Sequence, residues 1–261
     1  MHTGGPGEGT LGARMIIGLI SDVHANVIAL EAVLDALDER GAEVIVCLGD
    51  LVGYGPLPNE TVEMIKKRKV LTTLGAADER VAYSFAGPAA RRKGVADEIL
   101  EWTKSVMEPD NLAFLQSLSV QQRIQTPTGW LRFFHGSSDS TAVRLNLNQD
   151  PLTLGRLLER HRCNILVAGS THVPFYRKIS DTSMVLNPGS VGLSLNGEPG
   201  ADYALLSITD TGMNLEMDKV EYDFAAAAFE VLAWGLPAEV AEAIQHGRMP
   251  ERMGSGPDLE V

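Results

Sequence analysis

Residues 15–26 read "MIIGLISDVHAN", an apolar run that turns polar from one residue to the next. The apolar half predicts a short buried β-strand. Asp22 and His24 are two positions apart, so in an extended chain both side chains point to the same face. A strand that ends in a carboxylate and an imidazole on one face indicates a metal-binding edge.

The residues that follow alternate between helical and strand patterns. Residues 26–40 carry apolar side chains at helical spacing, with Asn26 as the predicted N-cap and Gly41 as the predicted stop. Apolar runs at 43–49 and 69–75 predict strands, and a second helical pattern lies between them. This alternation predicts βαβ units around a parallel sheet, and hence an α/β fold.

The sequence pattern in the rest of the chain predicts several different kinds of secondary structure in turn. Residues 79–118 predict irregular helices that form a small cap over the sheet. Apolar runs at 130–136 and 164–169 predict two more strands with a helix between them. Residues 175–222 hold short apolar segments separated by turns, which predicts an antiparallel meander. Two helices are expected in the C-terminal region after residue 222, and these would either serve a homo-oligomer or cover the sheet.

Length and composition predict a single folded domain. The chain has 261 residues, 44% of them apolar, which is enough for one sizeable core. We expect the domain to span 15–247, with flexible tails at 1–14 and 248–261. The N-terminus lacks the pattern of a secretory signal and no apolar run reaches membrane-spanning length, so the expected location is cytoplasmic. Cys47 and Cys163 lie in apolar runs and are expected to be free thiols.

The charge balance argues against nucleic acid as a partner. The formal net charge is −12, whereas a broad nucleic-acid surface needs concentrated Lys and Arg. The basic cluster "KKRK" at 66–69 is predicted to end a helix, where cations suit the helix dipole.

Five apolar runs end in polar residues, and in open α/β sheets ligands bind at the carboxyl ends of parallel strands. The residues at these ends are Asp22, His24, Asp50, His135 and His172. Two carboxylates and three imidazoles without a thiolate suit Mn, Fe, Zn, Ni or Co better than Ca. The competing interpretation makes each His a core residue and each Asp a turn residue. The residues alone therefore indicate a metal crevice of unspecified chemistry.

Five short motifs, taken in their order along the chain, indicate more than the residue types and spacing do. These are "SDVHAN" at 21–26, "GDLVGYGP" at 49–56, "HG" at 135–136, "STHVP" at 170–174 and "NPGSVG" at 187–192. Together they resemble the calcineurin-like metallophosphoesterases, in particular the compact bacterial and archaeal phosphodiesterases, from Met15 to Gly247. The resemblance implies a four-layer α/β/β/α sandwich of the metallo-dependent phosphatase type, with two metal ions at the strand ends.

The resemblance also implies which residues bind the metal ions, and it implies that some of these ligands are missing from this sequence. The first ion would be held by Asp22, His24, Asp50 and His172, all of which are present. The second would share Asp50 and use His135 with two further ligands, whose positions here hold Ala76 and Ser170. The position of the family's acid holds Ala77, so no general acid is assigned. One ion is therefore expected rather than two, with Asp50 and His135 as candidate catalytic residues.

Several nearby residues keep two interpretations. Asp78 would either cap a helix or reach inward to rebuild a second ion site. Asn26 would cap its helix, contact a substrate phosphate, or do both. Tyr54 would line the entrance or pack within its loop. The cations Arg80, Arg91 and Arg92 would either lie over the crevice or be solvated at the surface.

Two functions follow from the resemblance. The first is a metal-dependent phosphoesterase, a phosphodiesterase or nucleotide phosphatase whose partner is a small phosphorylated ligand or nucleotide, with no membrane involved. The alternative is a metal- or nucleotide-binding member of the family with weak or no turnover, favoured by the loss of two ligands at Ala76 and Ser170 and of the acid at Ala77.

Overall fold

The computed structural model describes residues 14–83, 94–142, 144–145 and 149–250. The two predicted tails lie almost wholly outside these residues, and so do Arg91 and Arg92. The extent of the domain therefore stays a prediction.

Ten strands form two five-stranded sheets within the described residues. The first sheet has the order β10 (Gly212–Val220), β9 (Ala201–Thr209), β1 (Arg14–Ile20), β2 (Val44–Cys47) and β3 (Leu71–Thr72). The second has the order β4 (Gln121–Thr126), β5 (Gly129–Phe134), β6 (Ile165–Ala168), β8 (Ser183–Asn187) and β7 (Phe175–Ser180). Strands β1, β2 and β3 run parallel, as do β5, β6 and β8. Strands β4, β7, β9 and β10 pair antiparallel with their neighbours.

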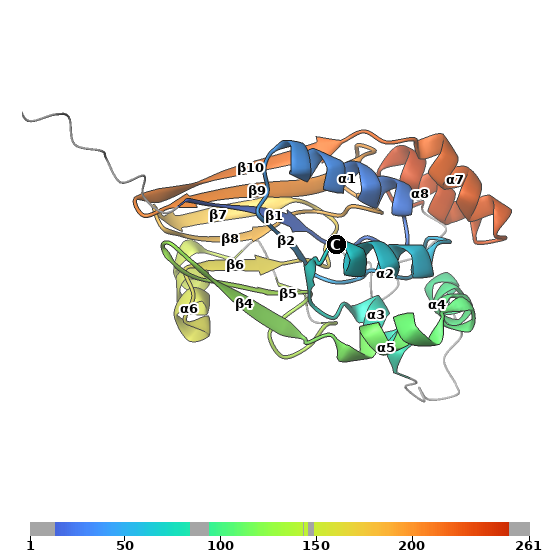
Figure 1. The fold of residues 1–261 in the computed structure, drawn as a ribbon, viewed down its shortest axis with the longest axis horizontal. Helices are drawn as coiled ribbons and strands as arrows, with labels where there is room; N and C mark the ends of the chain where they lie inside the picture. Colours follow the sequence, from blue (N-terminus) through green and yellow to red (C-terminus); the bar gives the residue numbers. More distant parts are fainter. Residues whose placement is uncertain (1–13, 84–93, 143, 146–148, 251–261) are drawn as a thin grey trace, which may run out of the picture.

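Helices cover the outer faces of the stacked sheets (Figure 1). They are α1 (Val27–Glu39), α2 (Pro58–Lys67), α3 (Ala76–Ala82), α4 (Val95–Val106), α5 (Pro109–Ser117), α6 (Pro151–His161), α7 (Phe224–Ala233) and α8 (Ala238–His246). Helices α1 and α2 pack on the first sheet, and α6 packs on the second. The predicted four-layer α/β/β/α sandwich is confirmed.

Strand β1 shows how the layers are filled. Ile17 and Leu19 face the second sheet and contact its inner residues, such as Phe133. Ile20 belongs instead to the core beneath α1, where it packs with Leu34. Because alternate residues of a strand face opposite sides, a run of apolar residues is needed to bury β1 on both faces.

Most local predictions are confirmed. The side chain of Asn26 caps α1 by accepting a hydrogen bond from the backbone N–H of Ala29 (3.1 Å), and Gly41 follows the helix with a φ of 73°. Lys66 and Lys67 lie in the last turn of α2. The helices of the region predicted at 79–118 are α4 and α5, together with α3, which begins earlier, at Ala76. Cys47 and Cys163 are free thiols, the first buried and the second partly buried.

The single meander predicted for 175–222 is wrong. Strands β7 and β8 belong to the second sheet, whereas β9 and β10 belong to the first. The segment between β8 and β9 therefore passes from one sheet to the other, because β8 pairs with β6 and β9 pairs with β1. Strand β4 was not predicted, since its residues "QQRIQT" are mostly polar, as suits an exposed edge.

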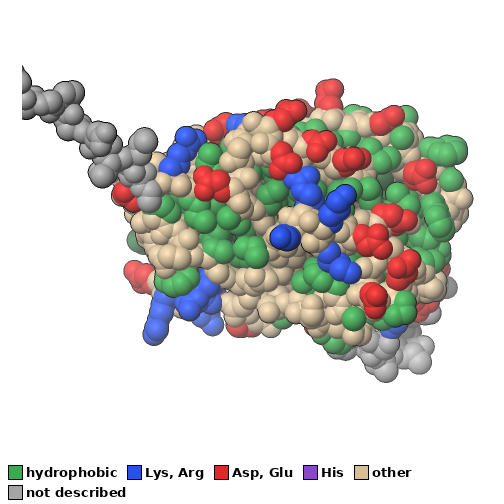
Figure 2. Space-filling model, in the orientation of Figure 1, with side chains coloured by type: hydrophobic (Ala, Val, Ile, Leu, Met, Phe, Trp, Pro, Cys, Tyr) green, Lys and Arg blue, Asp and Glu red, His purple; other side chains and the backbone are tan. Residues whose placement is uncertain are grey.

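Acidic side chains are spread over much of the face drawn in Figure 2, and Lys and Arg form only small groups there. Among the described residues, no helix has both the length and the apolarity that crossing a membrane requires.

Candidate metal centre

The five predicted ligands are all buried and meet at the carboxyl ends of the parallel strands. Asp22 and His24 follow β1, and Asp50 follows β2 in the same sheet. His135 follows β5, and His172 follows β6 in the other sheet. The site therefore lies where the edges of the two sheets come together, and neither sheet supplies it alone.

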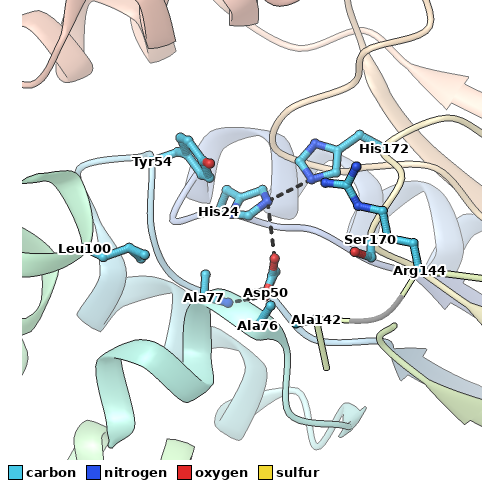
Figure 3. Close-up of a pocket in the computed structure, with 10 residues that line it drawn as sticks. All are labelled: His24, Asp50, Tyr54, Ala76, Ala77, Leu100, Ala142, Arg144, Ser170 and His172. Carbon is cyan, nitrogen blue, oxygen red and sulfur yellow. Dashed lines mark hydrogen bonds and ion pairs between the residues drawn. The ribbon is translucent and has the colours of Figure 1, made fainter. Parts of the chain in front are cut away.

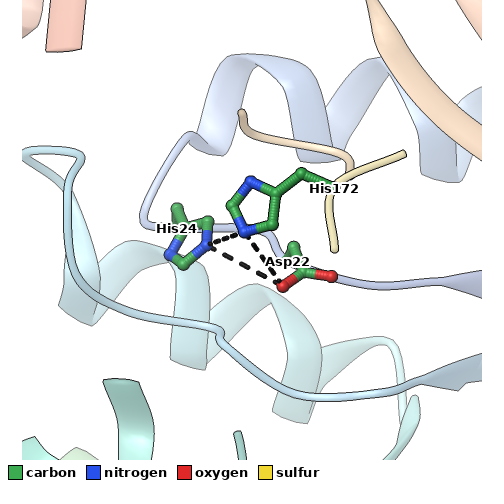
Figure 4. Close-up of side chains that lie close together, drawn as sticks. All are labelled: Asp22, His24 and His172. Atoms are coloured by element: carbon green, nitrogen blue, oxygen red, sulfur yellow. Dashed lines mark hydrogen bonds and ion pairs between the residues drawn. The ribbon is translucent and has the colours of Figure 1, made fainter. Parts of the chain in front are cut away.

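Asp22 is the carboxylate nearest the centre of this group. Its Oδ1 lies 3.3 Å from Nε2 of His172 and 3.9 Å from Nε2 of both His24 and His135. Figure 4 shows its carboxylate directed towards the imidazoles of His24 and His172. Its Oδ2 points elsewhere and accepts a hydrogen bond from the backbone N–H of Ser170 (3.1 Å). One oxygen thus orients the group and the other is presented to the site.

Asp50 is arranged in the same manner. Its Oδ2 lies 3.2 Å from Nε2 of His135 and 3.8 Å from Nε2 of His24. Its Oδ1 accepts a hydrogen bond from the backbone N–H of Ala77 at 2.7 Å (Figure 3). The N-terminal turn of α3 therefore holds this carboxylate in place.

All three imidazoles are held in one tautomer by the backbone. In each ring Nδ1 donates to a carbonyl oxygen, which leaves the lone pair of Nε2 facing the site. The acceptors of His24, His135 and His172 are the carbonyls of Val52 (3.3 Å), Leu48 (3.2 Å) and Leu193 (2.8 Å), respectively. This is the arrangement that a neutral histidine needs in order to ligate a metal through Nε2.

The backbone at the site is held in the left-handed region. The φ angles are 53° at Asp22, 49° at His24, 52° at Asp50, 73° at Ser170 and 57° at His172. Each such residue costs about 1–3 kcal/mol and persists only where its surroundings enforce the conformation, and such residues cluster at functional sites. Here backbone hydrogen bonds from Asp22 to Gly49 (3.0 Å) and from His24 to Asp50 (2.9 Å) help to enforce it.

Burial and charge shape the acid–base behaviour of the group. Burial opposes ionisation of Asp22 and Asp50, but the neighbouring imidazoles outweigh it and hold the pKa of both carboxyls below the usual range. Burial, helped by His172, lowers the pKa of His24 to about 4. At His135 the carboxylates of Asp50 and Asp22 overcome burial and raise the pKa to about 9. The two carboxylates thus make the site favourable for positive charge.

The side chains fit a bound metal ion. Oδ1 of Asp22 and Nε2 of His135 are buried without a hydrogen-bond partner in the protein. Nε2 of His24 and Nε2 of His172 face one another at 3.2 Å, and a cation would satisfy both lone pairs. Within the described residues, the donor atoms form two overlapping groups, Asp22–His24–His172 and Asp22–Asp50–His135. Oxygen and imidazole donors of this kind suit a divalent transition metal.

Comparison with known proteins agrees with this geometry. The calcineurin-like phosphoesterase superfamily domain matches residues 15–211. The chain belongs to this superfamily. It is therefore a metal-dependent phosphoesterase, a phosphoric ester hydrolase whose candidate ligands are those described above.

Two curated relatives extend the comparison. The uncharacterized protein MJ0912 of Methanocaldococcus jannaschii is 31% identical over 253 residues, which cover 90% of this chain and 99% of the archaeal protein. The phosphodiesterase YfcE of Escherichia coli K12 is 28% identical over 186 residues, which cover 71% of this chain and 84% of YfcE.

Solved structures show the same fold. A metallophosphoesterase from Sphaerobacter thermophilus superposes with a TM-score of 0.73 at 27% identity, covering 89% of this chain and 99% of that one. The hypothetical protein PH1004 from Pyrococcus horikoshii OT3 superposes with a TM-score of 0.77 at 20% identity, covering 90% and 100%.

Ala76, Ala77 and Ser170, which were predicted to replace two ligands and an acid, line a pocket beside the centre (Figure 3). Ala76 and Ala77 begin α3 and offer only methyl groups to this pocket. Ser170 lies on the opposite side of the view. Asp78 faces away, because its oxygens accept hydrogen bonds from the backbone N–H groups of Gly75 and Val52, both at 3.1 Å. The structure thus supports the helix-capping role of Asp78.

Of the two predicted substrate-binding residues, Asn26 is held by hydrogen bonds within the protein and Tyr54 lines the pocket. Besides capping α1, Asn26 donates to the carbonyl of Gly192 (3.1 Å) and to the hydroxyl of Tyr222 (3.2 Å). Its contact with a substrate stays a prediction. Tyr54 lines the pocket and stacks edge-on against His24, with ring centroids 4.9 Å apart.

Three pocket residues were missed by sequence reasoning, namely Leu100, Ala142 and Arg144. Leu100 comes from the cap helix α4, and the other two come from the segment after β5. No motif surrounds them, so only the path of the chain brings them to the site. Arg80, by contrast, forms an ion pair with Asp97.

Proposed function

We propose that this chain is a phosphodiesterase or nucleotide phosphatase for a small substrate, with one divalent metal ion held by Asp22, His24, Asp50 and His172. The carrying observation is the convergence of buried donor atoms. Two of them, Oδ1 of Asp22 and Nε2 of His135, lie close to oppositely charged groups of the site but form no hydrogen bond within the protein. A buried polar atom without a partner costs about 1–3 kcal/mol, so a group of them is retained where something binds.

The chain's own groups prepare the site for phosphoryl transfer. A divalent ion bound there would polarise a phosphoryl oxygen and lower the pKa of a water molecule. The carbonyls that accept from Nδ1 hold the three imidazoles with Nε2 towards the site, and the N–H groups of Ser170 and Ala77 orient the two carboxylates. Because the donors are buried, bulk water does not screen their interactions with a bound charge.

The alanine at position 77 limits the leaving groups. Attack of water on phosphorus breaks a P–O bond, and the departing oxygen needs a proton. Ala77 cannot supply one, so the oxygen must leave as an anion or take its proton from solvent. Loss of a general acid typically costs about 10²–10⁴-fold in rate. We therefore propose a preference for esters whose leaving group has a low pKa.

We also propose that a second ion, if bound, is held weakly. Asp50 and His135 remain near Asp22, but Ala76 adds no donor and Ser170 offers only a neutral hydroxyl. The positions that would complete a second site are thus the ones that have lost their ligands. The metal is proposed to be Mn, Fe, Zn, Ni or Co, in keeping with the donor types.

A binding protein without turnover is the second candidate. It is favoured by the methyl-lined wall at Ala76 and Ala77, where neither a ligand nor an acid is available. Such a protein would bind a nucleotide or phosphate on its metal and release it unchanged.

The test is hydrolysis of bis-p-nitrophenyl phosphate with added manganese, for the parent chain and for Asp50→Asn. Asparagine tolerates the left-handed backbone at this position and keeps an acceptor for the N–H of Ala77. Asp38→Asn is the matched control, because Asp38 is exposed and its carboxylate pairs only with Arg68 among the described residues.

We expect the parent chain and Asp38→Asn to hydrolyse the ester. Asp50→Asn should neither hydrolyse it nor bind manganese tightly. Equal background rates in all three would favour the binding protein. Full manganese content in Asp50→Asn would show that the ligand assignment is wrong.

A further inference from the structure

Arg144 is the residue of the pocket that the site described so far does not use. It lines the pocket together with Ser170 and His172. Figure 3 shows its side chain reaching from the segment after β5 towards the imidazole of His172. Of the described residues that line this pocket, Arg144 is the one that carries a permanent positive charge.

The surroundings leave this charge available to a ligand. Arg144 is half-buried, and none of the ion pairs found within the described part of the chain involves it. A guanidinium group keeps its positive charge under the conditions in which proteins are folded. Its planar fork of N–H donors matches two oxygens of a phosphate group.

The position of Arg144 relative to the lost ligands suggests what it does. In Figure 3 the donor atoms of His24 and Asp50 lie at the middle of the pocket, with Arg144 and Ser170 on one side. We propose that Arg144 binds the non-bridging oxygens of the substrate's phosphoryl group and supplies positive charge that a weakly held second ion does not. This inference rests on the proposed function, because it concerns the substrate of the same site.

The opposite wall of the pocket orients the rest of the substrate. Tyr54, Leu100 and Ala77 lie on that side, and it is largely apolar. With the phosphoryl oxygens directed to Arg144, the organic group of the ester points to this wall. An aromatic or other flat apolar group would contact Tyr54 and Leu100 there, which suits an aryl ester or a nucleotide base better than a highly charged group.

The test compares Arg144→Gln and Arg144→Lys with Arg177→Gln, a matched control on the exposed strand β7. Three quantities are measured: manganese content, binding of inorganic phosphate to the manganese-loaded protein by calorimetry, and kcat and KM for bis-p-nitrophenyl phosphate. Arg144 contacts none of the proposed ligands in a hydrogen bond, so manganese content should not change.

We expect Arg144→Gln to weaken phosphate binding by at least ~10-fold and to lower kcat/KM by ~10²–10³-fold, the usual effect of removing one oriented donor from a transition state. Arg144→Lys should recover part of both losses, because it restores the charge but not the fork. Arg177→Gln should match the parent.

Phosphate binding and kcat/KM within threefold of the parent in Arg144→Gln would overturn the inference, as would loss of bound manganese in that variant. If Asp50→Asn is inactive while Arg144→Gln is not, the inference fails and the proposed hydrolysis stands. If neither the parent nor any variant hydrolyses the ester, but Arg144→Gln still weakens phosphate binding, the inference stands and the proposed hydrolysis fails.

Discussion

Replacing Asn187 by alanine should both destabilise the protein and weaken its metal site. Asn187 ends β8 and its side chain is fully buried. Its Nδ2 donates to the carbonyl of Gly169 (2.9 Å) and to Oγ1 of Thr171 (3.0 Å), and its Oδ1 accepts from the N–H of Gly189 (2.8 Å). One amide therefore ties together the loop that carries His172 and the turn that follows β8.

The size of the effect follows from the groups left behind. Alanine would leave the buried carbonyl of Gly169 and the buried N–H of Gly189 without the partners they now have. Each unsatisfied buried group costs about 1–3 kcal/mol, so for these two groups we expect a loss of about 2–6 kcal/mol in the free energy of unfolding. For a chain of this size, a loss of 3 kcal/mol lowers Tm by about 6–12 °C.

The same change should reach the metal through His172. The loop from Gly169 to His172 would lose its anchor, and the direction of the imidazole would be less well defined. Changes to groups that orient metal ligands typically cost about 10–100-fold in metal affinity. Asn187 is not itself a proposed ligand, so a loss of affinity would report on positioning.

Urea unfolding of the metal-free protein measures the first effect, and manganese titration measures the second. Asn214→Ala is the matched control, because Asn214 is exposed on β10 and its side chain donates only to Glu216 in the described residues. An Asn187→Ala protein within about 0.5 kcal/mol of the parent, and with unchanged manganese affinity, would refute the reasoning.

Three further predictions concern the same region. Gly192→Ala should lower the free energy of unfolding by about 3 kcal/mol or more, because its Cβ would lie 1.8 Å from the carbonyl oxygen of Val23; a loss below about 1 kcal/mol in urea unfolding would contradict this. Restoring Asn at Ala76 and His at both Ala77 and Ser170 should raise turnover and strengthen binding of a second manganese ion; no gain in a folded, metal-loaded variant would count against a degraded site. Chelation should lower Tm, since an ion present at 100 times its Kd contributes about 2.7 kcal/mol; an unchanged Tm in a calorimetric scan would argue against a resident metal.

The convergence of the candidate ligands could be predicted because it depends on a local rule repeated along the chain. Asp22, Asp50, His135 and His172 each follow an apolar run closely. Parallel pairing brings the carboxyl ends of such strands to one edge, whatever the sequence between them. The predictions for the caps at Asn26 and Gly41 worked for the same reason, since a cap depends on its own helix.

Strand partners could not be predicted from periodicity. The short apolar segments of 175–222 have the pattern of β-strands, but this pattern does not say which neighbouring strand each one pairs with. Strand β4 carries too few apolar residues to signal a strand at all. Arg144 has no motif, and its place in the pocket depends on the route of the chain between β5 and α6.

The sequence alone determined which side chains stand at the strand ends and that positions 76, 77 and 170 hold alanine or serine, because those are properties of residue order. Only the tertiary structure decided how the groups act. It set the tautomer of each histidine through carbonyls distant in sequence, and it oriented Asp22 and Asp50 through the N–H groups of Ser170 and Ala77. It also brought Arg144 beside His172. Two of these contacts, from His135 to Leu48 and from Ser170 to Asp22, join segments of different sheets, and distances between such segments arise only when the sheets pack.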